Sequence, residues 1–145
     1  MTCNCLFSDG AIALSEGLQN NNTLTSLALA NNNIGNSAAM RLIAVLKDNF
    51  TLTALDISSN NIGDEAGIAI ADVLNCNHTL DTLRLHHNKI GNKGFSVLTN
   101  SMKSNFKLKR ITYDFQFSCP SDDARIRQIL KRNMKMFERW ERRKG

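Results

Sequence analysis

A 28-residue repeat governs this chain and limits the folds that it can adopt. The stretches LTSLALANNNIG, LTALDISSNNIG and LDTLRLHHNKIG begin at Leu24, Leu52 and Leu80, and all three obey the pattern L-x-x-L-x-[LI]-x-x-N-x-I-G. A fourth stretch, LKRITYDFQFSC, begins one period later at Leu108 and keeps only the first half of that pattern. Self-similarity at a fixed period of about 20 to 50 residues indicates stacked units, each of which buries its apolar face against its neighbours.

The first half of each repeat reads as a short strand that ends in a turn. Leucine or isoleucine alternates with small or polar residues, which is typical of a strand with one buried face. One asparagine follows each strand, and its buried amide can satisfy backbone groups that a tight turn leaves unpaired. The glycine that closes the pattern suits a backbone with positive φ. Counting back by one period extends the series of asparagines to the N-terminus and predicts an asparagine ladder, Asn4, Asn32, Asn60 and Asn88.

The second half of each repeat reads as a helix. Leu42 and Leu46 form a buried pair at helical i, i+4 spacing, and an equivalent pair recurs in every repeat along the chain. A small residue precedes each pair by four positions, as Ala38 does, and it lets the helix approach the strands closely. Strands that alternate with helices predict an α/β fold.

These repeats resemble leucine-rich repeats of the ribonuclease-inhibitor-like class. Similar repeats occur in NOD-like receptor repeat domains, tropomodulin, Ran GTPase-activating protein and bacterial effectors. The resemblance implies a right-handed solenoid, a horseshoe segment with parallel strands on its concave face and helices on its convex face. It implies little about function, because members of this class share a scaffold and bind different partners.

We therefore expect one leucine-rich-repeat domain over residues 1–145. Its expected parts are a partial N-terminal repeat at 1–22, three regular repeats at 23–106, a degenerate fourth strand and loop at 107–120, and a basic capping helix at 121–145. No amphipathic cap precedes the first repeat, and an open end of a solenoid exposes apolar core. Self-association through the uncapped N-terminal end is therefore a further expectation.

The side chains that the repeat leaves free are the candidates for binding a protein partner. On the concave face the alternation projects residues that are bland on the first strand and charged toward the fourth. We predict that the partner contacts this face, and the alternative is a solvated strand surface whose charges neutralise one another. The candidate residues are Asp56, Ser58, Arg84, His86, Arg110 and Asp114.

Other chemistry finds little support in the sequence. Adjacent His86 and His87 should point apart, as successive strand residues do, and so should not converge on a metal ion. No catalytic constellation or phosphate-binding loop is visible, so we expect no enzyme, metal or cofactor. A GTPase-activating role, as in Ran GTPase-activating protein, is a second alternative. The absence of a signal peptide or membrane span favours a cytoplasmic protein, or an effector delivered into a host cell.

The C-terminal segment carries the whole net charge of +5 and suggests a different alternative. It holds nine of the 18 Lys and Arg residues against four of the 13 Asp and Glu residues. An amphipathic basic helix can bind an acidic membrane or nucleic acid. Its aromatic residues either pack beside Phe115 and Phe117 or form an exposed edge. The candidate surface of this helix comprises Phe137, Trp140, Arg139, Arg142 and Arg143.

Overall fold

A computed structural model describes residues 6–114 and 120–143 of the chain. Helices and strands alternate along these residues, which confirms the predicted α/β class. The strands are short, and the last helix is the longest. The elements are α1 Phe7–Gln19, β1 Ser26–Ala28, α2 Gly35–Val45, β2 Ala54–Asp56, α3 Asp64–Cys76, β3 Thr82–Arg84, α4 Asn92–Met102, β4 Arg110–Thr112 and α5 Pro120–Glu141.

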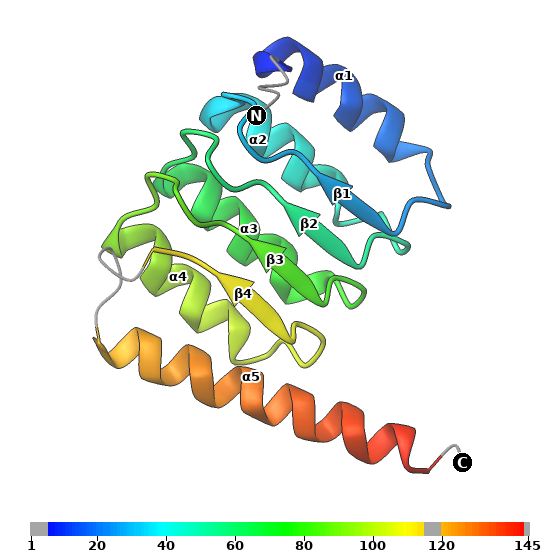
Figure 1. Ribbon diagram of the computed structural model, residues 1–145, viewed down its shortest axis with the longest axis vertical. Helices are drawn as coiled ribbons and strands as arrows, with labels where there is room; N and C mark the ends of the chain where they lie inside the picture. The colour runs from blue at the N-terminus through cyan, green and yellow to red at the C-terminus, as the bar shows by residue number, and fades with distance from the viewer. Residues whose placement is uncertain (1–5, 115–119, 144–145) are drawn as a thin grey trace.

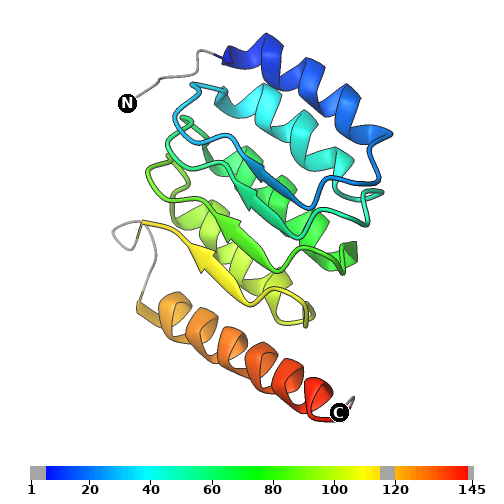
Figure 2. The same ribbon diagram turned by 45° about the vertical axis from the view of Figure 1, so that its right-hand side comes forward.

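The four strands form one parallel sheet in the order β1-β2-β3-β4. Residues that pair across neighbouring strands are one repeat apart in the chain, as Leu27, Leu55, Leu83 and Ile111 are. Helices α1 to α4 contact one another in sequence order and form a second layer on one face of the sheet (Figure 1). The turned view in Figure 2 shows α5 beyond α4 and β4, at the end of both layers.

The apolar core lies between the sheet and the helical layer. Leu42 and Leu98 are fully buried on the helices, and Leu55 and Leu83 are nearly so on the strands. Burial of a leucine side chain stabilises a fold by about 1.5 to 3 kcal/mol. Where α3 meets α4, a Cβ on Gly94 would lie 2.7 Å from Asp64 Oδ1. A small residue is therefore required there, as the sequence predicts.

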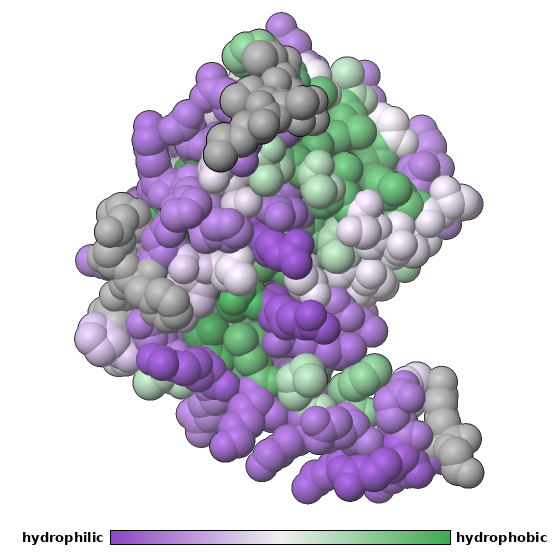
Figure 3. Space-filling model, viewed as in Figure 1, coloured by the Kyte–Doolittle hydropathy of each residue, from purple (hydrophilic) through white to green (hydrophobic). Residues whose placement is uncertain are grey.

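At the N-terminal edge of the fold the core is partly uncovered. Leu24 and Leu27 are only partly buried, whereas Leu52 and Leu55, their counterparts in the next repeat, are at most 2% exposed. Apolar surface is visible between α1 and β1 in Figure 3. This edge is the surface on which the expected self-association would depend, and that expectation stays a prediction.

The turns after the strands correct one expectation. Of Gly35, Gly63 and Gly91, only Gly35 has a positive φ, at 73°. The left-handed bend falls earlier in the turn, on residues that include Asn61 and His87, each with a φ of 57°. The other two glycines instead lie beside polar side chains from the preceding repeat.

Those polar side chains connect each repeat to the next. Asn36 Oδ1 accepts the N–H of Gly63 at 2.7 Å. One repeat later, Asp64 Oδ1 accepts the N–H groups of Gly91 and Gly94 at 2.7 and 3.0 Å. The first N–H groups of a helix lack partners within it and favour a negative charge nearby. Each side chain thus satisfies the start of the following helix.

Helix α5 packs one face against the last repeat. Ile126, Ile129 and Asn133 on this face are buried. Pro120 opens the helix, where its missing N–H costs nothing. None of the described helices, α5 included, is long and apolar enough to cross a membrane.

Candidate functional site

The face of the sheet that is turned away from α1 to α4 carries two rows of side chains in register. The row that ends each strand places Asp56 beside Arg84, and Arg84 beside Thr112. Two residues earlier, Thr82 pairs with Arg110. Arg84, Arg110 and Thr112 are exposed, and Asp56 and Thr82 are half-buried. We call these five residues the open sheet face.

Asp56 and Arg84 form an ion pair across the first of these strand junctions. Arg84 Nη1 lies 3.6 Å from Asp56 Oδ2, and the arginine side chain is half exposed. Asp56 is also held from its own strand, because its Oδ1 accepts the N–H of Ser58 at 3.0 Å and the hydroxyl at 2.6 Å. Ser58 is only 2% exposed and its hydroxyl supports Asp56, so its contact with a partner stays a prediction.

The histidine pair lies differently from the expectation that the two rings point apart. His87 has left the strand, with a φ of 57°, and its ring meets that of His86 edge-on, with centroids 5.1 Å apart. His86 Nδ1 lies 2.9 Å from Thr112 Oγ1, and His87 Nδ1 lies 3.5 Å from Asp114 Oδ1. Within the described residues, no three His, Cys, Asp or Glu side chains gather to hold a metal ion.

Asp114 and Arg110, both on or just after β4, differ in their roles. Asp114 Oδ2 accepts the N–H of Asn88 at 3.3 Å, so this carboxylate supports the backbone of the preceding turn. Arg110 is exposed and forms no ion pair with any described carboxylate. Among the candidates, Arg110 is therefore the side chain whose charge is most available to a partner, and Arg84 is half exposed beside its ion-pair partner Asp56.

The asparagine ladder holds the turns beside this face. Asn60 Oδ1 accepts the N–H groups of Asn32 and Ile34 at 2.9 and 3.3 Å. Its Nδ2 donates to the carbonyl oxygens of Leu29 and Ser58 at 2.7 and 2.9 Å. The amide of Asn88 repeats this pattern one repeat later, and that of Asn32 accepts the N–H of Leu6. Asn4 lies outside the described residues.

A second series of asparagines, all buried except the partly buried Asn21, holds the opposite ends of the strands. Asn77 Nδ2 donates to Leu46 O at 2.7 Å, and its Oδ1 accepts the N–H of Leu80 at 2.9 Å. The recurrence of Asn21, Asn49 and Asn77 one repeat apart predicts a repeated turn at the exit of each helix. The structure adds that the series continues with the same spacing into α5. The members are Asn21, Asn49, Asn77, Asn105 and Asn133.

The aromatic residues of α5 are partly exposed. Phe137 is 37% exposed and lies under Lys109, whose Nζ is 3.5 Å from the ring centroid. Trp140 is 50% exposed, with its ring centroid 6.1 Å from that of Phe137. Phe115 and Phe117, the expected packing partners, lie outside the described residues.

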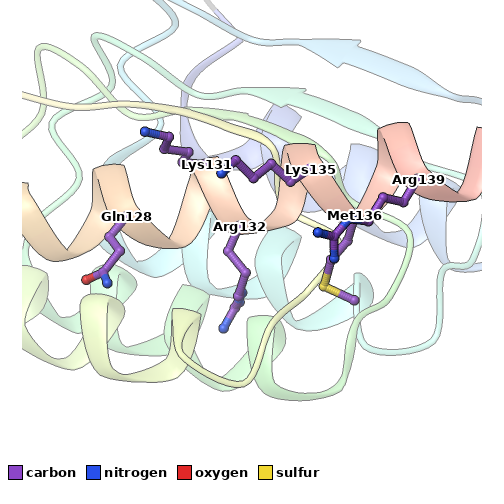
Figure 4. Close-up of a pocket in the computed structure, with 6 residues that line it drawn as sticks. All are labelled: Gln128, Lys131, Arg132, Lys135, Met136 and Arg139. Atoms are coloured by element: carbon purple, nitrogen blue, oxygen red, sulfur yellow. The ribbon is translucent and has the colours of Figure 1, made fainter.

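The candidate arginines at the end of α5 and in the turn after it face solvent. Arg139, Arg142 and Arg143 are exposed. Figure 4 shows Arg139 in a shallow hollow that is formed by side chains of α5 alone, together with Lys131 and Lys135 among others. This helix therefore presents a basic surface that is separate from the open sheet face.

Tyr113 joins β4 to the start of α5. Its hydroxyl donates to Asp123 Oδ1 at 2.9 Å, and its ring lies 5.1 Å from that of Phe95. Burial, and then the hydrogen bond and negative charge of Asp123, raise the pKa of Tyr113 well above its ordinary value of about 10. This contact fixes the C-terminal helix to the sheet.

We expect the folded chain to show no tyrosinate absorbance near pH 10. Tyr113 is the only tyrosine, so a spectrophotometric titration reports on this residue alone. Because folding raises this pKa, Tyr113 contributes its full stabilisation at pH values below its pKa in the unfolded chain. The fold loses that stabilisation as the pH rises above about 10. The chain unfolded in urea is the control and should titrate near pH 10. An identical curve for the folded chain would contradict the buried contact.

Comparisons with known proteins place these features in context. A family model described as the TMOD/LMOD leucine-rich domain matches residues 8–136. A solved structure described as leiomodin-1 actin-binding site 2 (ABS2) superposes with a TM-score of 0.90 at 26% sequence identity, covering 97% of this chain and 82% of that one. The C-terminal domain of a Caenorhabditis elegans tropomodulin gives 0.84 at 20% identity, covering 95% and 83%. The second likeness shows the fold alone, and no curated protein sequence matches the chain significantly.

Proposed function

Because the chain belongs to the family of TMOD/LMOD leucine-rich domains, as the match across residues 8–136 shows, we propose that it is a non-enzymatic module that binds actin. The leiomodin-1 domain, whose structure matches 97% of the length of this chain, is described as an actin-binding site. A binding role also suits a chain whose charged side chains stand on a rigid sheet. The protein would act in the cytoplasm, where its partner is found.

We place the binding surface on the open sheet face. The observation that carries this choice is the exposure of Arg84 and Arg110 on adjacent strands, on a face that no described helix covers. Neighbouring strands lie about 4.8 Å apart, so the two side chains reach the same partner surface. Residues held on strands lose little conformational entropy on binding. Asp56 adds an acceptor of opposite charge at the edge of this surface.

The finer architecture belongs to the same proposal. A sheet whose neighbouring strands are offset by exactly one repeat is what a leucine-rich-repeat solenoid produces, and we propose that the open sheet face is its concave side. The leucine-rich character predicted from the sequence is confirmed at the level of the family. Membership of the ribonuclease-inhibitor-like class stays a prediction.

The test is binding of the double variant Arg84→Ala/Arg110→Ala to purified actin, measured by co-sedimentation with filaments and by titration of monomers. We expect affinity to fall at least tenfold, because one arginine at the centre of an interface contributes about 2 kcal/mol. The matched control is Lys47→Ala/Lys93→Ala, which removes two exposed charges from the helical side.

Two results would contradict the proposal. If the wild-type chain binds neither filaments nor monomers, actin is not the partner. If the wild-type chain binds and the double variant binds equally well, the open sheet face is not the contact surface. Unchanged thermal melting of both variants would establish that any loss of affinity comes from the surface itself.

A further inference from the structure

We propose that the solvent side of α5 is a second docking surface, which binds the anionic surface of a lipid membrane. The proposal rests on α5 alone and does not depend on actin binding. It concerns a row of five exposed cations, which we call the basic stripe: Lys131, Lys135, Arg139, Arg142 and Arg143.

The five cations share one side of the helix because their spacing follows its period. Steps of three and four residues keep side chains on the same side of an α-helix. Lys131, Lys135 and Arg139 are four residues apart, and the two final arginines continue the row into the turn after α5. Figure 4 shows the first three of these side chains as they leave the helix.

The fold fixes this side toward solvent. On the opposite side Ile126, Ile129 and Asn133 are buried, and Asn133 Nδ2 donates to the carbonyl oxygens of Asn105 and Leu108 at 3.1 and 2.7 Å. The helix therefore cannot rotate to hide its cations.

Arg132 strengthens this attachment. Its guanidinium donates to the carbonyl oxygens of Lys103 and Asn105 at 2.8 and 2.7 Å. The same guanidinium lies 4.1 Å from the centroid of the Phe106 ring. Although Arg132 is cationic and close to the stripe in sequence, it is committed to the fold and is not part of the docking surface.

The basic stripe is not neutralised by its own helix. None of its five side chains forms an ion pair with a described carboxylate. Glu138 lies three residues after Lys135 and four before Arg142, so it flanks the stripe, and Glu141 lies farther round the helix. Neither glutamate lines the hollows that Lys135, Arg139 and Arg143 help to form. The charge of the stripe is therefore available to anions outside the molecule.

Apolar side chains border the stripe on its other side. Met136 and Trp140 are 47% and 50% exposed, and they share a hollow with Arg139 and Arg143. Tryptophan is enriched at membrane interfaces, where its ring contacts apolar chains and its N–H stays near polar headgroups. Cations beside such residues match an anionic headgroup layer over a hydrocarbon interior.

A membrane fits this surface better than nucleic acid does. The stripe runs along the exposed side of α5 at one end of the molecule, where a flat layer can approach it. A nucleic acid would satisfy the charges, but it would leave the methionine on the border without an apolar partner. The proposed contact is peripheral, because the buried face of α5 remains packed on the last repeat.

The experiment is sedimentation of the full chain with vesicles of phosphatidylserine and phosphatidylcholine in equal parts, and with vesicles of phosphatidylcholine alone. We expect binding to the mixed vesicles only, weakened as salt shortens the range of the charges. Trp140 is the only tryptophan in the chain, so its emission reports on the border of the stripe. We expect this emission to shift to the blue on the mixed vesicles.

The variant Lys135→Glu/Arg139→Glu/Arg142→Glu should bind the mixed vesicles at least about thirtyfold more weakly. The matched control, Arg41→Glu/Lys47→Glu/Lys93→Glu, changes net charge equally with exposed residues on α2, in the turn after α2 and on α4, and it should retain binding. Equal losses in the two variants would overturn the stripe as the docking surface. So would vesicle binding without a blue shift. If the wild-type chain does not bind vesicles, an anionic membrane is not the partner of the stripe. This holds whether or not the chain binds a single-stranded RNA probe.

Discussion

Replacing Asn60 with alanine is expected to lower the free energy of unfolding by about 4 kcal/mol. The Asn60 amide is fully buried and serves four backbone groups in two successive turns. Each buried donor or acceptor left without a partner costs about 1 to 3 kcal/mol, partly offset where a turn relaxes or water enters. Urea denaturation followed by circular dichroism measures the change.

The matched control for Asn60 is Asn75→Ala. Asn75 is exposed in α3, and its amide makes one long contact, in which Ser104 Oγ donates to Asn75 Oδ1 at 3.4 Å. We expect this control to change stability by less than about 0.5 kcal/mol. Asn60→Asp separates the accepting role of the side chain from its donating role, because a carboxylate can still accept hydrogen bonds but donates none. A cost below about 1 kcal/mol for Asn60→Ala would mean that the ladder does not hold the turns.

Asn133→Ala is expected to cost about 2 to 3 kcal/mol, more than removal of every residue after it. The Asn133 side chain is 1% exposed and donates to two buried carbonyl oxygens. Residues 134–143 are exposed, and the Phe137 ring lies under Lys109 of the last repeat. Deletion of residues 134–145 should therefore lower stability by about 1 kcal/mol or less.

Thermal and urea unfolding of the two variants show whether the end of α5 packs on the last repeat or serves as an exposed surface. If the deletion destabilises the chain more than Asn133→Ala does, then the aromatic end of the helix is a packing element and the basic stripe is incidental. Gln128→Ala is a suitable control, because Gln128 is an exposed position on the same helix. Its effect should stay within about 0.5 kcal/mol.

The repeat predicted the fold well because each of its positions has a single environment. Leu55 and Leu83 occupy the same slot, pair with each other in the sheet and are both buried. Asn60 and Asn88 are likewise buried, and each donates to one carbonyl oxygen in its own turn and to one in the preceding repeat. Because stacked units give equivalent positions the same neighbours, an assignment made in one repeat is checked by the same position in the others.

The candidate site was less predictable, because its residues are the ones that the repeat leaves free. Alternation alone assigned Ser58 to the surface, but the serine turns its hydroxyl to Asp56 and is buried. Asp114 was predicted to contact a partner, and the structure uses it to support Asn88 where the ladder loses its asparagine. His87 turns back toward His86 because the bend passes through its backbone.

By itself the sequence determined the order of strands and helices, the parallel sheet and the buried asparagines, because a constant period gives every unit the same set of neighbours. Tertiary structure alone decided which charges remain available. Arg84 and Asp56 pair because their strands are adjacent, and Arg132 is held by carbonyl oxygens that lie in the preceding repeat. No local pattern records such contacts, since hydrogen bonds and ion pairs depend on distances that only the folded chain sets.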